Sequence, residues 1–155
     1  MSFRAGLAAA LAFAAAGASV AVAQGGGAPV ARRAQLAPPV IRESFTPLPC
    51  SGRPSARSTL QEEGCAEQRI LATDAQINAL AKSIFSLLAD DAARRRFIAA
   101  HHAWLLYRHA DCLSRSDLFE GGTLAGVIDA QCTADRNAQR VRDLRTFASD
   151  LRRHG

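Results

Sequence analysis

Residues 101–112 read HHAWLLYRHADC, residues 113–123 read LSRSDLFEGGT, and residues 124–144 read LAGVIDAQCTADRNAQRVRDL. In the first and third segments the apolar residues recur at steps of three and four, which is typical of a helix with one buried face. Each of these two segments contains one cysteine, and a Gly-Gly pair lies between them. This order predicts a helical hairpin with a disulfide bond across it.

The same helical spacing continues on both sides of the hairpin, and no stretch alternates in the manner of a strand. We expect a short first helix that Ser58 or Thr59 caps, with Glu62 or Glu63 completing the capping box and Gly64 weakening its end. A second helix should span about residues 66–89. A third should run from Asp90 or Asp91 to about residue 119, and a fourth should follow Thr123. Asp74 falls in the buried register of the second helix, so it is expected to point inward. The predicted fold class is all-α, a small disulfide-linked bundle of three to four helices around the hairpin.

The N-terminal stretch has the features of an export signal. Arg4 precedes an alanine-rich apolar run that ends at Ala21-Val22-Ala23, the small residues that a signal peptidase accepts. The weak hydrophobicity of the run argues against a retained transmembrane helix. We therefore expect residues 1–23 to be a signal peptide and the mature protein to be periplasmic or secreted, with no stable membrane insertion.

The next segment, residues 24–49, is rich in Gly, Ala and Pro and has no helical periodicity. Such a segment buries too little apolar surface to offset the entropy of ordering it. We predict a flexible linker, followed by a helical domain that spans residues 50–155.

The cysteines Cys50, Cys65, Cys112 and Cys132 all lie in the predicted helical domain. An even number of cysteines in an exported protein indicates disulfide bonds. Zinc is the rival explanation, but no pair has the C-x-x-C spacing of common structural sites. Of the three possible connectivities we expect the two between sequence neighbours, Cys50–Cys65 and Cys112–Cys132.

The positive charge of the chain does not predict a nucleic-acid partner. The formal net charge is +5, but Arg4, Arg32, Arg33 and Arg42 all precede the predicted helical domain. A nucleic-acid-binding protein usually carries a denser basic face on its folded part. We therefore expect no nucleic acid among the partners.

Three histidines of the hairpin raise the question of a metal site. His102 and His109 are seven residues apart, whereas metal-binding pairs on a helix usually lie three or four apart, and neither they nor His101 has an obvious third ligand. We expect these histidines to be solvated or half-buried and no metal or other cofactor to bind. No G-x-S-x-G or H-E-x-x-H motif occurs, so the chain is predicted to be non-enzymatic.

Several short motifs together resemble those of one family of small secreted bacterial proteins. They are Cys50 and Cys65; Asp74 with Ile77-Asn78; Trp104, Tyr107, Arg108 and Cys112; Gly121-Gly122; Cys132; and Arg140 with Leu144. This set resembles the LprI-type lysozyme-inhibitor family over about residues 50–144. The family often has glutamine where His101 stands and threonine where Asn137 stands. The resemblance implies a small helical domain and an inhibitor of lysozyme-like muramidases.

Arg108 is the charge most relevant to the fold. It shares a helix face with Trp104 and Cys112, so its stem is expected to be packed and its guanidinium to be paired. Stacking on Trp104 and an ion pair with Asp74 would both satisfy it. We interpret Asp74, Trp104, Arg108 and Arg140 as structural residues of the motif rather than as a ligand site.

The turn between the hairpin helices is the expected contact with a partner. Gly121 and Gly122 suit a turn, and Asp117, Phe119 and Glu120 would flank it with negative charge and one aromatic ring. Such a loop suits the cleft of a cationic lysozyme. The alternative hypothesis is a cell-envelope interaction module with another partner. It is motivated by Arg136, Arg140, Arg142 and Arg145 on the fourth helix.

Overall fold

Three long helices form the fold in the computed structural model, which describes residues 35–154. They are α1 (Thr59–Leu87), α2 (Asp91–Ser116) and α3 (Leu124–His154), with short 3-10 turns η1 (Pro54–Ala56) and η2 (Asp117–Phe119). No strand occurs in this range, so the all-α prediction is confirmed. The predicted signal peptide, residues 1–23, and the linker up to residue 34 lie outside the described residues.

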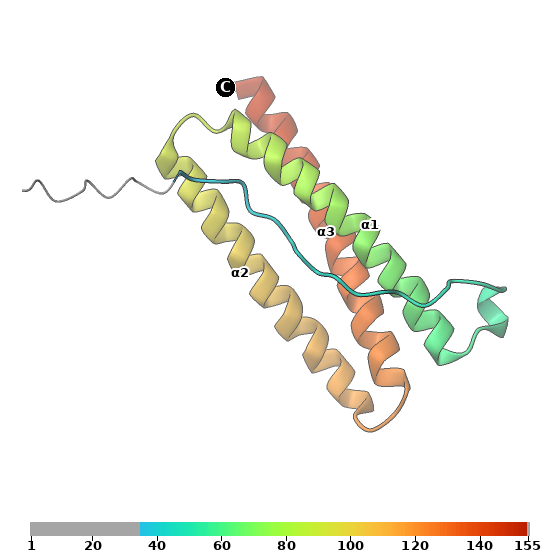
Figure 1. Cartoon of the computed structure of the whole chain (residues 1–155). Helices are drawn as coiled ribbons and strands as arrows, with labels where there is room; N and C mark the ends of the chain where they lie inside the picture. The colour runs from blue at the N-terminus through green and yellow to red at the C-terminus, as the bar shows by residue number, and fades with distance from the viewer. Residues whose placement is uncertain (1–34, 155) are drawn as a thin grey trace, which may run out of the picture. The chain divides into compact units, whose positions relative to one another are not determined.

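The helix α3 packs against both other helices, most extensively against α1 (Figure 1). Arg69 of α1 lies 3.9 Å from Asp135 of α3, and Gln76 accepts a 2.9 Å hydrogen bond from Arg145. From the first pair to the second, both chains advance in the same direction, so α1 and α3 run parallel. The helix α2, which lies between them in the sequence, runs antiparallel to both. Within residues 35–154, none of the helices combines the length and apolar character needed to cross a bilayer.

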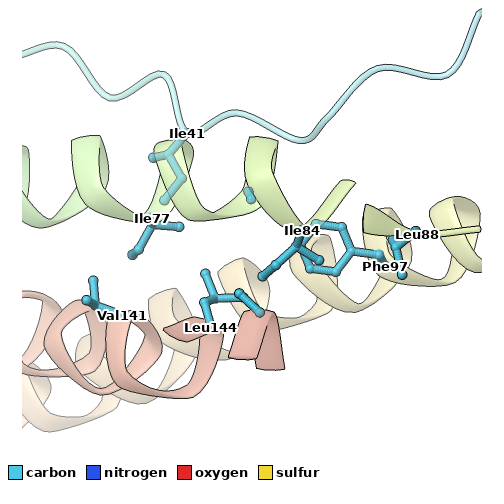
Figure 2. Packing of buried hydrophobic residues seen from close by; sticks show 9 residues of the cluster. Ile41, Ile77, Ile84, Leu88, Phe97, Val141 and Leu144 are labelled. Atoms are coloured by element: carbon cyan, nitrogen blue, oxygen red, sulfur yellow. The ribbon is translucent and has the colours of Figure 1, made fainter. Parts of the chain in front are cut away.

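The main core lies where the apolar faces of the three helices meet (Figure 2). Its buried members are Ile41, Ile77, Ala81, Ile84, Leu88, Phe97, Val141, Leu144 and Ala148. Ile77 and Ile84 are one heptad apart on α1 and fully buried, as the predicted helical register requires. A smaller cluster, Ala66, Ile70, Ala130 and Ala134, joins the first halves of α1 and α3.

The helix α1 begins with a capping box. The Ser58 hydroxyl accepts a 3.3 Å hydrogen bond from the Gln61 amide, and the Gln61 side chain accepts a 3.0 Å bond from the Ser58 amide. Ser58 was predicted as the cap, but its partner is Gln61 rather than Glu62 or Glu63. The expected short helix and the second helix are one continuous element, because Gly64 lies inside α1 without breaking it.

An extended segment, residues 36–48, lies along α1 and runs in the opposite direction; we call it the strap (Figure 1). The sequence predicted a flexible linker through residue 49, and for the strap the structure differs. The Ile41 side chain is buried in the core, and the Asn78 amide bonds the Ile41 backbone at both its N–H and its C=O. The strap therefore belongs to the packing of the helical domain.

Gly64 marks the place where the strap comes closest to α1. A Cβ atom at this position would lie 2.6 Å from the Leu48 Cβ and 2.7 Å from the Leu48 carbonyl oxygen. The Gln68 side chain, one turn further on, donates a 3.0 Å hydrogen bond to that same carbonyl. Glycine is thus required here by the close approach of another backbone, not as a helix terminator.

Two disulfide bonds join the predicted cysteine pairs. Cys50 and Cys65 have a Cα–Cα distance of 4.6 Å, and Cys112 and Cys132 one of 5.4 Å. The first bond fastens the chain just after the strap to α1. The second crosses the α2–α3 hairpin as predicted.

The hairpin turn also follows the sequence prediction. The helical path continues past Ser116 through η2, which confirms a helical turn before Phe119. Gly121 then takes a φ of +80°, a conformation that glycine adopts without strain. The last helix starts at Leu124, directly after Thr123.

Replacing Gly64 with alanine tests the close approach of the strap. Alanine is about 1 kcal/mol better than glycine inside a helix, but here its methyl group meets backbone. We expect Gly64→Ala to lower the free energy of unfolding by about 1 kcal/mol, because overpacking outweighs the gain in propensity. Denaturant unfolding followed by circular dichroism measures this change.

Gly126→Ala is the matched control. Its new Cβ would lie 2.6 Å from the Glu63 carboxylate, which ends a flexible side chain and can swing away. We expect this variant to be unchanged or more stable by up to about 1 kcal/mol. Equal stabilisation of both variants would contradict the role assigned to Gly64.

Candidate functional site

Arg108 lies at the centre of a buried polar cluster that we define as Asp74, Arg108 and Asn137, and the exposed Glu43 joins this cluster from the surface. Its Nη1 donates a 2.7 Å hydrogen bond to the Asn137 side-chain oxygen and lies 3.5 Å from an Asp74 carboxylate oxygen. Its Nη2 pairs with the Glu43 carboxylate of the strap. One guanidinium on α2 thereby joins α1, α3 and the strap.

Asn137 completes this network from α3 and is fully buried. Its amide nitrogen donates to Asp74 at 2.8 Å and to the Thr73 hydroxyl at 3.1 Å, while its oxygen accepts from Arg108. The sequence analysis did not select Asn137 or Glu43 as site residues. A signal existed for Asn137, since it occupies the apolar register of α3 between Ala134 and Val141.

Asp74 points inward, as its register predicted, and is only 5% exposed. Burial, together with the negative charge of Glu43, raises its pKa to about 6, against the opposing effect of the Arg108 charge and the hydrogen bonds from Asn137 and Arg108. The carboxylate is therefore ionised at neutral pH. It depends on Arg108 and Asn137 to remain so inside the protein.

Trp104 forms an aromatic platform beside the buried polar cluster. The Arg108 guanidinium lies 5.2 Å and the Arg140 guanidinium 5.3 Å from the indole ring centroid, within cation–π range. The proposed stacking of Arg108 on Trp104 is thus present. Burial lowers the pKa of Arg140. Its Nε atom is buried with no hydrogen-bond partner among the described residues, so the indole is its principal neighbour on this side.

His101 corrects the expectation of solvated or half-buried histidines. It is fully buried, its ring centroid lies 5.8 Å from that of Trp104, and neither ring nitrogen has a hydrogen-bond partner within the described part of the chain. Burial, aided by the positive charge of Arg140, lowers its pKa to about 4. His101 is therefore a neutral core residue at physiological pH, while His102 and His109 are exposed.

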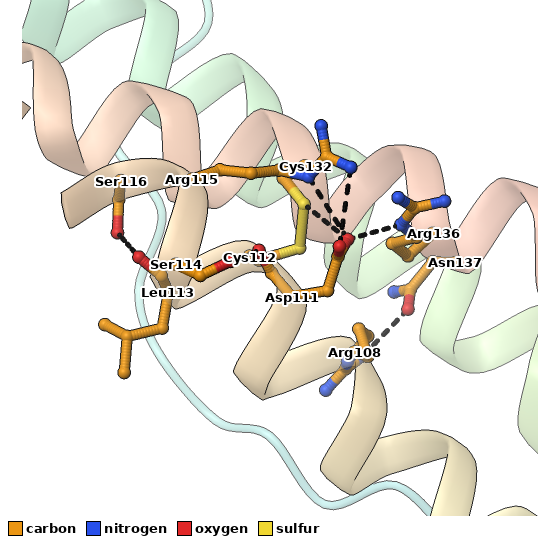
Figure 3. The surroundings of a disulfide bond; sticks show 10 residues. All are labelled: Arg108, Asp111, Cys112, Leu113, Ser114, Arg115, Ser116, Cys132, Arg136 and Asn137. Carbon is orange, nitrogen blue, oxygen red and sulfur yellow. Dashed lines mark hydrogen bonds and ion pairs between the residues drawn. A yellow bond between two sulfur atoms is a disulfide. The ribbon is translucent and has the colours of Figure 1, made fainter. Parts of the chain in front are cut away.

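Asp111 organises the surface next to the hairpin disulfide (Figure 3). It accepts hydrogen bonds from Arg115 at 3.2 Å and from Arg136 at 2.8 Å, and these bonds lower the pKa of its carboxyl group. Its carboxylate also lies close to the sulfur atoms of Cys112 and Cys132. These sulfurs are joined in a disulfide and are not thiolates, so the three residues do not form a metal site.

The predicted partner loop lies at the end of the hairpin. Asp117, Phe119, Glu120, Gly121 and Gly122 are all solvent-exposed. Phe119 is 38% exposed, and its neighbour Leu118, which the sequence analysis did not select, is 82% exposed. The loop thus presents two apolar side chains between two carboxylates.

A negatively charged hollow begins at Gly126, in the first turn of α3. Its volume is about 250 Å³, and carboxylates from three elements line it: Glu43 of the strap, Glu63 and Glu67 of α1, and Asp129 of α3. We call it the acidic hollow. Arg108 also lines it, but its positive charge is already shared by Glu43 and Asp74.

A comparison with protein families assigns the chain to a known family. The family described as lysozyme inhibitor LprI matches residues 50–144, more than half of the chain. The chain belongs to the LprI family. Comparisons with curated proteins and with solved structures give no match.

The LprI match covers both disulfides, the Trp104–Arg108 motif and the hairpin loop. In the structure the aspartate, tryptophan and arginine motif residues meet in the interior of the bundle. Asn78 of the Ile77-Asn78 step holds the strap. Disulfides and LprI membership together point to an extracellular or periplasmic protein.

Removal of Arg108 should destabilise the fold. In Arg108→Ala, the Asp74 carboxylate loses its cation while remaining buried, and we expect a loss of about 3 kcal/mol in the free energy of unfolding at pH 7. The loss should be smaller at pH 5, because Asp74 is then largely protonated. Urea unfolding at both pH values measures the effect.

Arg115→Ala provides the control for Arg108, since it also removes an arginine from α2. Its partner Asp111 keeps Arg136, and the Arg115 pair is exposed, so the loss should be within about 0.5 kcal/mol. Similar losses in the two variants would refute the central role of Arg108.

His101 should make stability depend on pH. Its folded pKa of about 4 lies below the ordinary value of 6.5, so the unfolded chain binds the proton more readily and this histidine lowers stability as the pH falls from about 6.5 to about 4. The variant His101→Gln lacks this penalty. Its stability relative to the wild type should rise by about 2 kcal/mol between pH 7 and pH 4.5.

Taking the difference between the two proteins removes the opposing contribution of Asp74, which both retain. Another exposed histidine of α2 supplies the control, and His109→Gln, whose charge is not among those that act on His101, should show no comparable rise. The assignment fails if His101→Gln also runs parallel to the wild type.

Proposed function

We propose that this protein is an exported, non-enzymatic inhibitor of lysozyme-like muramidases. The match to the LprI inhibitor family across the disulfide-linked domain carries this proposal. The disulfides and the export signal predicted for residues 1–23 agree with a protein that meets muramidases outside the cytoplasm.

The hairpin loop is the contact surface that we propose. The Cys112–Cys132 disulfide and η2 hold the loop in place, so little conformational entropy is lost when it docks. Leu118 and Phe119 offer exposed apolar surface that can be buried in a cleft. A rigid projection of this kind suits an inhibitor that enters the concave active site of a glycan hydrolase.

Local negative charge favours a cationic partner despite the positive net charge of the chain. Asp117 and Glu120 lie in the loop, and the acidic hollow begins one turn into α3. Long-range steering between two basic proteins is unfavourable. Ion pairs between a basic partner and the carboxylates of the loop and the acidic hollow would offset this repulsion at short range.

The alternative of an envelope module that binds an anionic polymer has less support from the side-chain contacts. Of its four arginines, Arg136 pairs with Asp111 and Arg140 lies over Trp104. Arg142 and Arg145 remain on the exposed surface of α3. Two of the four are thus engaged by partners within the chain, which leaves a sparse basic face.

A titration of muramidase activity tests the proposal. We expect the wild type to inhibit a cationic lysozyme, and Asp117→Asn with Glu120→Gln to raise the inhibition constant about tenfold without lowering thermal stability, because two charge-assisted contacts are lost. Wild-type inhibition should also weaken between about 0.05 and 0.3 M salt, since the loop carboxylates are exposed and screened.

Asp135→Asn with Asp143→Asn is the control, because it removes the same charge from the exposed surface of α3. This variant should inhibit as the wild type does. No inhibition by the wild type would refute the proposed function, whereas equal inhibition by all three proteins would place the contact outside the loop.

A further inference from the structure

The strap packs like a bound peptide against the surface that carries Asn78 of α1 and Arg108 of α2, and we call this surface the groove. It is extended, it lies between α1 and α2 in Figure 1, and these two helices have few direct backbone approaches. The strap thus bridges the two helices through its bonds to Asn78 and Arg108. Its contacts show what the groove recognises.

Asn78 forms hydrogen bonds with the backbone of the strap. Its side-chain oxygen accepts a 2.8 Å hydrogen bond from the Ile41 N–H, and its side-chain nitrogen donates a 3.0 Å bond to the Ile41 C=O. A strand edge offers the same pair of groups to an added peptide. Asn78 therefore holds one residue of an extended chain independently of that residue's side chain.

The helices also contact two side chains of the strap. Ile41 is 7% exposed and enters the core beside Ile77 and Ala81. Two positions later, Glu43 pairs with the buried guanidinium of Arg108. The residue between them, Arg42, is exposed. The groove thus selects a branched apolar residue followed two positions later by a carboxylate.

The strap is fastened at a limited number of points. Besides the Ile41 and Glu43 anchors, Pro39 is buried and the Leu48 carbonyl accepts the Gln68 hydrogen bond, while most of the other residues, including Phe45, are exposed. Segments with few buried contacts open at a smaller free-energy cost than the core. The helices beneath are fixed by their own packing and by the Cys112–Cys132 disulfide, so the groove can persist when the strap leaves. The Cys50–Cys65 disulfide keeps the displaced strap tethered to α1.

We propose that the groove between α1 and α2 is a binding site for an extended acidic peptide of a partner protein, and that the strap occupies it until such a peptide displaces it. The peptide carries the pattern of Ile41 and Glu43, an isoleucine-like residue and a carboxylate two positions later. The site is separate from the hairpin loop, and it shares Arg108 and the strap residues Glu43 and Phe45 with the acidic hollow. It does not depend on muramidase inhibition.

Competition from the tethered strap sets the affinity of the groove. A tethered segment competes at an effective concentration of about 1 mM, so an identical free peptide binds weakly until the strap is loosened. The variant Ile41→Ala with Glu43→Gln loosens the strap and leaves Asn78 and Arg108 intact. This full-length variant should bind the free peptide much more tightly than the wild type.

The probe is a fluorescent synthetic peptide of residues 36–48 that carries Arg42→Gln so that trypsin does not cut it. By fluorescence anisotropy we expect saturable binding to the loosened variant, about tenfold or more tighter than to the wild type. Adding Asn78→Ala should abolish the gain, whereas adding Gln76→Ala, an amide of α1 away from the strap, should preserve it. A peptide lacking both the isoleucine and the glutamate should not bind.

Trypsin cleavage after Arg42 gives a second measurement on the unaltered protein. This bond lies between the two anchors, so it is cut only when the strap leaves the groove. An excess of the probe peptide should accelerate this cleavage, because it holds the groove open. The proposal is overturned if the peptide leaves the cleavage rate unchanged, or if the folded loosened variant binds no peptide or binds it equally well with Asn78→Ala.

Discussion

The buried charge of Arg108 imposes the strongest constraint on this fold. A guanidinium in the interior is tolerated only when its donors are paired, and the cost of leaving it unpaired is several kcal/mol. Here the partners come from three separate parts of the chain, Asp74 on α1, Asn137 on α3 and Glu43 on the strap. All three parts contribute to satisfying the charge. The network therefore selects one arrangement of the helices among those that apolar packing alone would allow.

The sequence predicted most of the helical hairpin but not the strap. Periodicity and cysteine count are local signals, so the helix faces could be predicted and one of three disulfide connectivities could be preferred, which the structure confirms. The attachment of the strap depends on one buried side chain, Ile41, and one amide, Asn78, which are separated by 37 positions along the chain. The Gly- and Pro-rich composition of residues 24–49 predicts a flexible linker, so it gives no sign of such a contact. Gly64 was misread for the same reason, because the backbone that requires it lies outside its own helix.

The candidate site was predicted unevenly. Asp74 and Arg108 were expected to meet because both carry charge on apolar faces, and they do. The complete burial of His101 was not predicted. A histidine on the apolar face of a helix can be half-exposed or fully buried, and the sequence pattern does not distinguish these two cases. The loop residues Asp117 to Gly122 were expected to be exposed, and they are. What they bind depends on a partner surface that this chain does not encode.

Both disulfides lie toward one end of the bundle, where α1 and α3 begin and α2 ends. The opposite end, with the turn from Leu88 to Asp90 and the last turns of α3, is held by side-chain packing and by hydrogen bonds from Arg94 to the Phe85 and Leu88 carbonyls, without a covalent cross-link. Cross-links restrict opening mainly within the loops they close, so amide protons should exchange along a gradient that is slow near Cys132 and fast beyond Ala148. The helices are thus cross-linked at the end that carries the hairpin loop, and their opposite ends should open at a smaller cost.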